Sequence, residues 1–158
     1  MAAHDALHPA RKLYHALGID PSKTRPSSEA LLRRILQKKP LYRVNAVVDA
    51  ANFASLTLLL PIGLYDAAKI EPPVILRAGL EGERYEGIRK DAVHLTDRPV
   101  LVDQRGPFGN PTSDSLRTCV TETTRSVWFV LFAPADYPAA TMREELARAR
   151  EMLRKHAG

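Results

Sequence analysis

Helical patterns at both ends of the chain enclose a middle that carries only short strand patterns. Apolar residues recur at helical spacing over residues 4–17, 28–39 and 139–155, and the first two stretches stop at Gly18 and Pro40. Separation of helices from strands along the chain favours an α+β fold over a βαβ winding. The sequence therefore predicts an α+β fold in which helices flank a mixed or antiparallel sheet.

The length of the chain fits one domain. A chain of 158 residues can bury a substantial core. Hydrophobic residues make up 45% and charged residues 26% of it, which is the composition of a globular protein rather than of a disordered one. We expect a single domain over residues 1–158, in which residues 1–40 form a basic helical lead-in.

The helical patterns predict which side chains are buried. Residues 28–39 predict a helix with Ser27 as its N-cap, and residues 45–60 predict a buried helix that Pro61 ends. The expected buried stripes are Leu31, Leu32, Ile35 and Leu36 in the helix over residues 28–39, and Met142, Leu146, Ala149 and Leu153 in the last helix.

Six segments of the middle predict strands, at residues 62–65, 74–78, 83–88, 93–95, 100–103 and 126–133. Residues 79–82 predict a hairpin turn between the second and the third of them. The last segment is almost continuously apolar, which predicts a central strand covered on both faces. Residues 106–115, rich in glycine, proline and polar side chains, predict a long loop.

Positive charge is concentrated in the first third of the sequence. The whole chain has a net charge of +5, and residues 1–45 carry nine Lys and Arg against three Asp and Glu. Such a lobe can attract a polyanion, because it neutralises phosphates and releases their counterions. The alternative is that these cations form the solvated face and end of a helix.

Three polar residues share one face of the helix predicted over residues 45–60. Asn45, Asp49 and Asn52 are spaced i, i+4, i+7. On an otherwise apolar helix such groups either find partners or line a wet pocket. From spacing alone, a satisfied structural network is the better of the two interpretations.

Two glycine-containing segments are candidates for ligand contact. Gly63 follows Pro61 and permits a backbone or a ligand to approach closely; the alternative is a plain helix-to-strand turn. The loop over residues 106–115 contains Gly109, and Arg117 just beyond it adds donors, so the segment suits a phosphate, carboxylate or oxyanion. The alternative is a solvent loop held by its own Asx and Ser/Thr turns.

Taken in order, these segments resemble the editing domain of the phenylalanyl-tRNA synthetase beta chain. The matching segments are residues 43–53 (RVNAVVDAANF), 60–66 (LPIGLYD), 76–77, 81–83, 100–103 and 120–127 (VTETTRSV). The resemblance spans residues 41–132, and residues 17–34 are similar to the lead-in of free-standing single-domain relatives. It implies the same α+β fold and a pocket that hydrolyses an amino acid wrongly esterified to tRNA.

The resemblance also implies site residues. The family's pocket uses an asparagine in the helix, a histidine after the proline and a glutamate in the later loop. Here Asn52 matches the asparagine, Gly63 stands in place of the histidine, and Asp114 is the acid nearest to the glutamate. Because two of the three positions differ, tyrosine specificity is not carried over.

The residues that the resemblance assigns fall into three groups. Asn52 and Asp114 are implied as catalytic. The residues implied to bind the substrate are Asn45, Gly63, Gly109, Ser113, Ser115, Arg117 and Thr118. The residues implied to bind tRNA phosphates are Arg33, Arg34, Lys38, Lys39 and Arg43.

We therefore expect a trans-editing hydrolase that deacylates mischarged aminoacyl-tRNA and contacts the aminoacylated 3′ end. The alternatives are a non-catalytic module that binds tRNA or an amino acid, and a structural or partner-binding role. No cofactor, metal, DNA or membrane contact is expected, since no nucleotide-binding motif or apolar run of about 20 residues occurs. The single cysteine, Cys119, and the absence of a signal-peptide pattern predict a cytoplasmic location.

Overall fold

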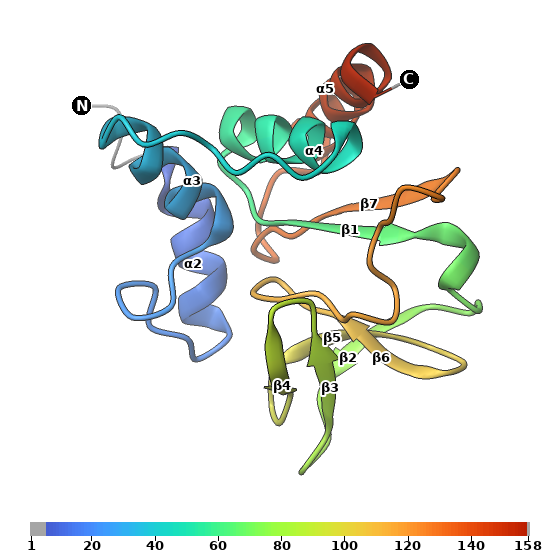
Figure 1. Cartoon of the computed structure of the whole chain (residues 1–158). Coiled ribbons are helices and arrows are strands. Elements are labelled where there is room, and N and C mark those ends of the chain that lie inside the picture. The colour runs from blue at the N-terminus through green and yellow to red at the C-terminus, as the bar shows by residue number, and fades with distance from the viewer. Residues whose placement is uncertain (1–5, 158) are drawn as a thin grey trace. The chain divides into compact units, whose positions relative to one another are not determined.

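The computed structural model describes residues 6–157, and of Lys90 and Asp91 only the backbone (Figure 1). The chain divides into two compact units. We call residues 1–62 and 131–158 the helical unit, and residues 63–130 the strand unit. The expected α+β fold is confirmed, whereas the single domain with a separate lead-in stays a prediction. The first two residues of the helix predicted over residues 4–17 lie outside the described residues.

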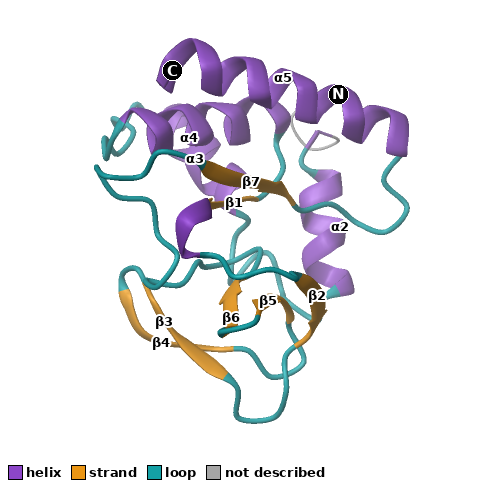
Figure 2. Cartoon of the chain, turned by 90° about the vertical axis from the view of Figure 1, so that its right-hand side faces the viewer, coloured by secondary structure: helices purple, strands orange, loops and turns teal. Residues whose placement is uncertain are grey.

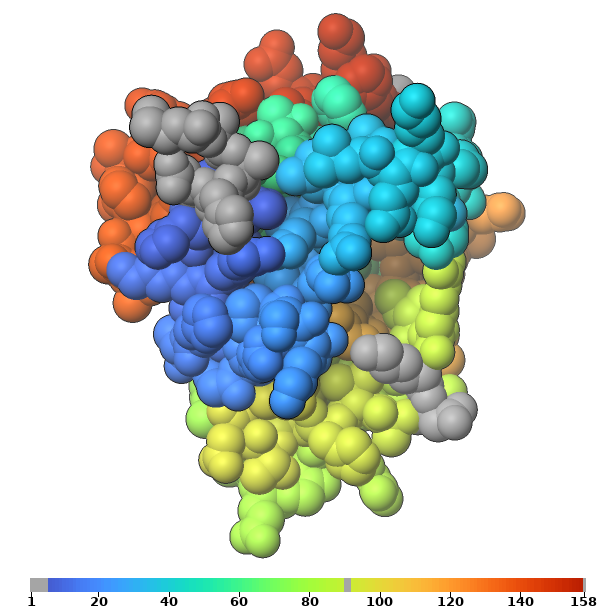
Figure 3. Space-filling view, turned by 90° about the vertical axis from the view of Figure 1, so that its left-hand side faces the viewer, coloured from blue at the N-terminus to red at the C-terminus, as the bar shows by residue number. Residues whose placement is uncertain are grey.

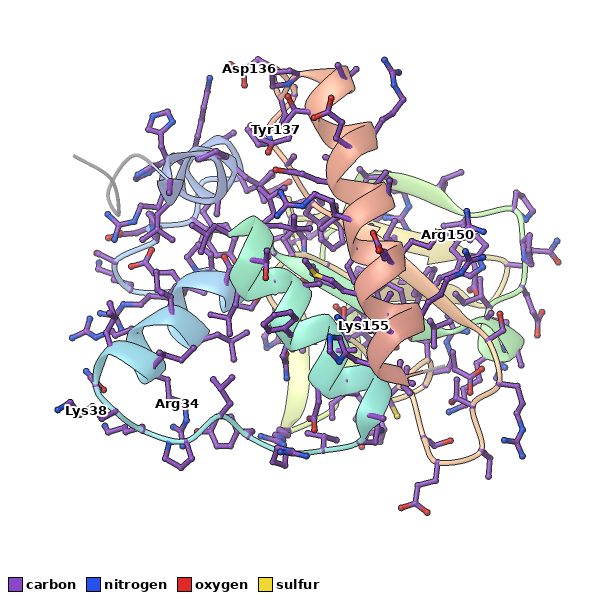
Figure 4. The ribbon with its side chains drawn as sticks, turned by 90° about the horizontal axis from the view of Figure 1, so that it is seen from above. Arg34, Lys38, Asp136, Tyr137, Arg150 and Lys155 are labelled. Carbon is purple, nitrogen blue, oxygen red and sulfur yellow. The ribbon has the colours of Figure 1, made fainter. Side chains whose placement is uncertain are left out.

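The described residues of the helical unit form four helices: α2 (His8–Ala16), α3 (Ser27–Leu36), α4 (Ala46–Leu58) and α5 (Ala139–Ala157). α4 packs against both α3 and α5, and Figure 4 shows it between them from above. Its alanines make this possible, because Ala50 and Ala54 are buried and let the neighbouring backbones approach. The sequence predicted all four helices.

Residues next to the helices determine where α2 ends and where α4 begins. After α2, Gly18 adopts a φ of +67°, and the Ile19 N–H donates to the Tyr14 carbonyl at 2.9 Å. Before α4, the Asn45 side chain accepts a hydrogen bond from the Val48 N–H at 2.9 Å. Asn45 is therefore the N-cap of α4. The spacing had predicted that Asn45 belongs to a polar face within the helix, and this prediction is wrong.

α3 differs from its prediction in cap, length and buried face. Ser27 is its first helical residue, Pro26 occupies the N-cap position without a side-chain cap, and the helix ends at Leu36. Leu36 is 72% exposed, and the buried side of α3 carries Glu29 instead. Glu29 accepts hydrogen bonds at 2.8 and 2.7 Å from Arg11 of α2. The bidentate ion pair between Arg11 and Glu29 therefore determines which face of α3 packs against α2. Ile35 is exposed, as Leu36 is.

α5 begins at its predicted residue and ends two residues later than predicted, and its buried stripe is narrower than predicted. Ala149 is fully buried, and Met142 and Leu153 are half-buried. Leu146 is exposed, although it shares the predicted stripe with Ala149. Glu145 lies on the packed side, where it accepts hydrogen bonds from the Tyr137 hydroxyl at 2.8 Å.

Seven strands and a 3₁₀ turn occupy the middle of the chain. They are β1 (Ile62–Asp66), η1 (Ala67–Lys69), β2 (Ile75–Ala78), β3 (Arg84–Gly87), β4 (Lys90–His94), β5 (Pro99–Asp103), β6 (Gly106–Gly109) and β7 (Val127–Leu131). β2, β5 and β6 form an antiparallel sheet in that order, β3 pairs antiparallel with β4, and β1 pairs with β7. Figure 2 shows the first two groups.

Three strand predictions are corrected. Residues 79–82 do not join β2 to β3 in a hairpin, because β2 pairs with β5 and β3 pairs with β4. Gly79 lies against Leu95, the residue after β4: a Cβ on Gly79 would be 2.0 Å from the Leu95 carbonyl oxygen. Residues 106–109 pair with β5 as β6, so the predicted loop starts later. β7 pairs with β1 alone and leaves Trp128 38% exposed, so it is not a central covered strand.

A buried ion pair ties the strand unit together. The Asp103 side chain is fully buried and accepts hydrogen bonds from the Arg117 guanidinium at 2.9 and 3.1 Å. It also accepts from the backbone N–H groups of Glu71 and Arg105, each at 2.9 Å. Burial alone would raise the pKa of Asp103, but these donors outweigh it and hold the pKa below its ordinary value.

Arg117→Ala should destabilise the protein by about 3–5 kcal/mol, because it leaves a buried carboxylate without its counter-ion. Arg105 is a matched control, since it is half-exposed and its pairing with Glu71 is loose, at 3.7 Å. Arg105→Ala should cost under about 1 kcal/mol. Urea unfolding of the two variants measures this difference, and equal losses would contradict it.

Candidate functional site

A basic hollow opens on the helical unit beside α3. It has a volume of about 360 Å³. Its cationic lining residues are Lys23, Arg25, Arg33, Arg34 and Lys39. None of the described residues that line it is Asp or Glu. Figure 3 shows this face, with α2 and α3 in blue and the segment after α3 in cyan.

The hollow gathers part of the cation set that the sequence predicted. Arg33, Arg34 and Lys39 line it, whereas Lys38 is exposed just outside it. Lys23 and Arg25 were missed, although they precede α3 directly in the sequence. Glu29 lies close by, but Arg11 and Arg25 neutralise it, so the hollow remains positively charged.

A second groove, of about 690 Å³, lies along α4 and the segment before it. Asn52 is half-buried and lines this groove, as do Arg43 and Asp49, which form an ion pair at 2.9 Å. Phe53 and His156 of α5 complete the wall, with ring centroids 5.7 Å apart in an edge-to-face arrangement. Asn52 therefore has an open groove beside it rather than solid packing.

The strand unit holds the other predicted site residues. The two glycines among these residues, Gly63 and Gly109, have a structural role. A Cβ on either Gly63 or Gly109 would lie 2.2 Å from the Tyr65 hydroxyl. The buried Tyr65 ring also packs edge-to-face on Phe108, with centroids 5.0 Å apart. The close approach that Gly63 and Gly109 permit is therefore made by a side chain of the protein itself.

Internal hydrogen bonds shape residues 110–115. The Asn110 side-chain oxygen accepts from the Thr112 N–H at 2.8 Å and from the Ser113 N–H at 2.9 Å, an Asx turn. The Tyr85 hydroxyl donates to the Ser113 carbonyl. Ser115 and Thr118 are buried, and their hydroxyls share a hydrogen bond of 3.0 Å. The hydroxyls of Ser115 and Thr118 are thus engaged with each other.

Asp114 is the titratable group of this loop with the most perturbed environment. Burial raises its pKa to about 7, although the nearby Tyr65 hydroxyl and the Leu64 N–H favour the charged form. The hydroxyl and the carboxylate lie close, but Tyr65 Oη and Asp114 Oδ1 have no well-aligned hydrogen bond among the described residues. A carboxyl tuned near neutrality can exchange a proton at physiological pH.

Arg117 is committed to structure. Besides Asp103, its guanidinium donates to the carbonyls of Lys69 and Gly106, at 3.0 and 3.3 Å. It forms part of a hollow of about 380 Å³ that Ser115 also lines, so its remaining edge faces open space. Tyr65 and Tyr85 surround the loop and were missed, since nothing in their sequence context separates them from core aromatics.

The predicted site residues fall on both units. Asn45, Asn52 and the tRNA-binding cations belong to the helical unit, and the remaining ones belong to the strand unit. Within residues 6–157, no group of three His, Cys, Asp or Glu side chains is placed to hold a metal ion. No helix in the described part of the chain is both long and apolar enough to span a bilayer.

The Asp114 carboxyl, whose Oδ1 is buried, predicts a pH-dependent stability. Its folded pKa of about 7 exceeds the ordinary aspartate value, so between about pH 4 and 7 the folded protein keeps a proton that the unfolded chain has lost. Stability should therefore fall as pH rises through that window, by up to about 4 kcal/mol.

Thermal unfolding from pH 5 to 8 tests this expectation. Asp114→Asn should flatten the profile, because the amide does not titrate. Glu122→Gln, at an exposed carboxylate of the same unit, should leave the slope unchanged. An unaltered slope in Asp114→Asn would show that another group governs the pH dependence.

Gly63→Ala should destabilise the protein by about 1–3 kcal/mol, because the new methyl group overlaps the buried Tyr65 hydroxyl. In a Tyr65→Leu background the same change should cost clearly less, since the space is then free. Denaturant unfolding of the four proteins gives the coupling between the positions. Additive losses would refute the packing explanation.

The comparisons with known proteins agree with the motifs. The sequence model of the B3/4 domain family matches residues 9–156. The phenylalanine–tRNA ligase beta subunit of Synechococcus sp. is 33% identical over 137 residues, which cover 74% of this chain and 16% of that protein. The corresponding subunit of Corynebacterium glutamicum is 29% identical over 119 residues, covering 71% and 13%. That of Streptomyces avermitilis is 32% identical over 97 residues, covering 58% and 11%.

The chain therefore spans less than a fifth of the length of these relatives. The resemblance to a domain of the phenylalanyl-tRNA synthetase beta chain is confirmed, and the antiparallel strands and four helices agree with it. Because the family model matches nearly the whole sequence, this chain belongs to the B3/4 domain family.

Proposed function

We propose that this chain binds tRNA through its helical unit and hydrolyses the ester of a mischarged aminoacyl-tRNA in the cytoplasm. The basic hollow carries the proposal: five cations line it, and none of its described lining residues is a carboxylate. The helical unit holds fourteen Lys and Arg against eight Asp and Glu, whereas the strand unit holds nine against ten. RNA phosphates are suited to such a surface.

Membership in the family supplies the second support. The relatives are phenylalanine–tRNA ligase beta subunits, so their name connects them to tRNA. Because the chain spans under a fifth of them, the ligase reaction is not transferred to it. What we transfer is the contact with tRNA and, through the motif resemblance, the removal of a wrong amino acid.

The chemistry that we propose needs few groups. An aminoacyl ester is already activated, so a positioned water and hydrogen-bond donors for the developing oxyanion suffice. Asn52 lines an open groove and carries an amide that can orient water or the substrate amine. In the strand unit, Asp114, with a pKa of about 7, is a separate candidate as a proton acceptor.

A panel of correctly charged and mischarged tRNAs tests the proposal, with release of the amino acid as the readout. We expect accelerated deacylation of at least one mischarged tRNA. Asn52→Ala and Asp114→Asn should each slow it, the latter by about 10²–10⁴-fold with loss of a pH dependence near 7. Gln104→Ala, at an exposed amide of the strand unit, is the control and should retain the rate. No accelerated deacylation on any tRNA would refute the hydrolase.

A non-catalytic module that binds tRNA is the second candidate. The observation that favours it is Gly63: it has no side chain where the family has histidine, and Tyr65 fills the adjacent space. This candidate predicts tRNA binding that weakens steeply with salt, together with deacylation no faster than in buffer. Binding of a free amino acid that does not depend on salt would indicate a small-molecule sensor instead.

A further inference from the structure

The basic hollow and the Asn52 groove of the helical unit meet at one residue. Tyr42 lines both of them. We propose that the two together form a track for an unpaired RNA strand, with phosphates in the basic hollow and bases against Tyr42 and Phe53. This inference rests on the proposed function and specifies which part of an RNA the helical unit takes.

The charge along the track favours a phosphate backbone. Lys23, Arg33 and Lys39 line the hollow at one end. Arg43 lines the groove, where its side chain is 89% exposed and pairs with Asp49 of the same groove. Its ion pair with Asp49 is solvent-exposed and therefore weak, so a phosphate can compete for the guanidinium.

Aromatic side chains line the track where the basic hollow meets the groove, and within the groove itself. Tyr42 is 54% exposed and Phe53 is 50% exposed, and both rings belong to the groove wall. The Arg34 guanidinium lies 4.0 Å from the centre of the Tyr42 ring, which holds the ring in place. A positively charged groove with exposed aromatic rings is the arrangement by which proteins stack unpaired bases.

The groove also offers a reader for base edges. Asn52 lies beside Phe53 along α4, and its amide can both donate and accept hydrogen bonds. Figure 4 shows the two flanks of α4: Arg34 and Lys38 on one side, and Arg150 and Lys155 of α5 on the other. Cations thus stand on both sides of the helix that carries Asn52.

An unpaired strand fits this surface better than a duplex does. In a duplex the bases stack on one another and are closed to side chains, and only phosphates and groove edges are accessible. A duplex would use the cations but leave the two rings against solvent. An occupant with flat apolar faces of its own would cover the half-exposed aromatic rings in this groove of about 690 Å³.

Fluorescence anisotropy with a labelled single-stranded RNA of about eight nucleotides tests the track. We expect the unpaired strand to bind more tightly than a duplex of the same sequence. Phe53→Leu and Tyr42→Leu keep apolar bulk and remove the ring, so each should weaken binding about 5- to 100-fold. Trp128→Leu is the matched control, because Trp128 is an exposed aromatic of the strand unit, and it should bind like the wild type.

The charges are tested in the same assay. Arg33→Gln and Lys39→Gln should weaken binding and lower the slope of log affinity against log salt by about 0.7 each. Arg148→Gln, at an exposed arginine of α5 outside both hollows, should leave the slope unchanged.

A base-stacking readout that needs no variant protects the test against misfolding. A strand carrying 2-aminopurine should lose fluorescence on binding, because stacking quenches that base. Binding without quenching, equal affinity for duplex and single strand, or aromatic variants that bind like the wild type would each overturn the track. An acidic peptide can be added as a competitor. If the peptide displaces no RNA, the track is supported; if the protein binds the peptide but binds no RNA, the track is overturned.

The outcome separates the track from the proposed function. If tRNA is deacylated while the aromatic variants bind RNA normally, the hydrolase stands and the track fails. If the single strand binds and is quenched while no tRNA is deacylated, the track stands and the hydrolase fails.

Discussion

The buried Asp103 carboxylate is the constraint on which the strand unit depends. A carboxylate removed from water must be met by donors, and here Arg117 supplies two of them while the backbone at Glu71 and Arg105 supplies two more. These donors come from before β2, from the turn after β5 and from beyond β6. One ionised group therefore holds together three segments that lie outside the strands.

This constraint determines what the neighbouring loop can do chemically. Arg117 also satisfies the carbonyls of Lys69 and Gly106, so little of its hydrogen-bonding capacity remains for a ligand. Ser115 and Thr118 bond to each other in the same region. Asp114 is the exception, because one of its oxygens is buried without a partner among the described residues. The loop is thus a rigid frame around a single poised carboxyl.

The helical unit divides its work differently. Its internal charges are neutralised in pairs, as Glu29 is by Arg11, whereas the cations around the basic hollow have no carboxylate among the described lining residues. Of the cations that line the hollow, Arg25 lies 4.0 Å from Glu29, so the other cations carry the excess of positive charge. In the track that we propose, phosphates lie in the basic hollow and the adjoining rings give the bases a place to stack.

The sequence by itself determined the helices, most strand positions, the excess of cations and the family, because these depend on periodicity, composition and ordered motifs. It also led to Asn52, which does line a groove. Tertiary structure alone decided that Leu36 is exposed while Glu29 is buried, and that Gly63 makes room for Tyr65. The physical reason is that burial and pairing depend on which segments meet in space, and the spacing of residues along one segment carries no record of its neighbours.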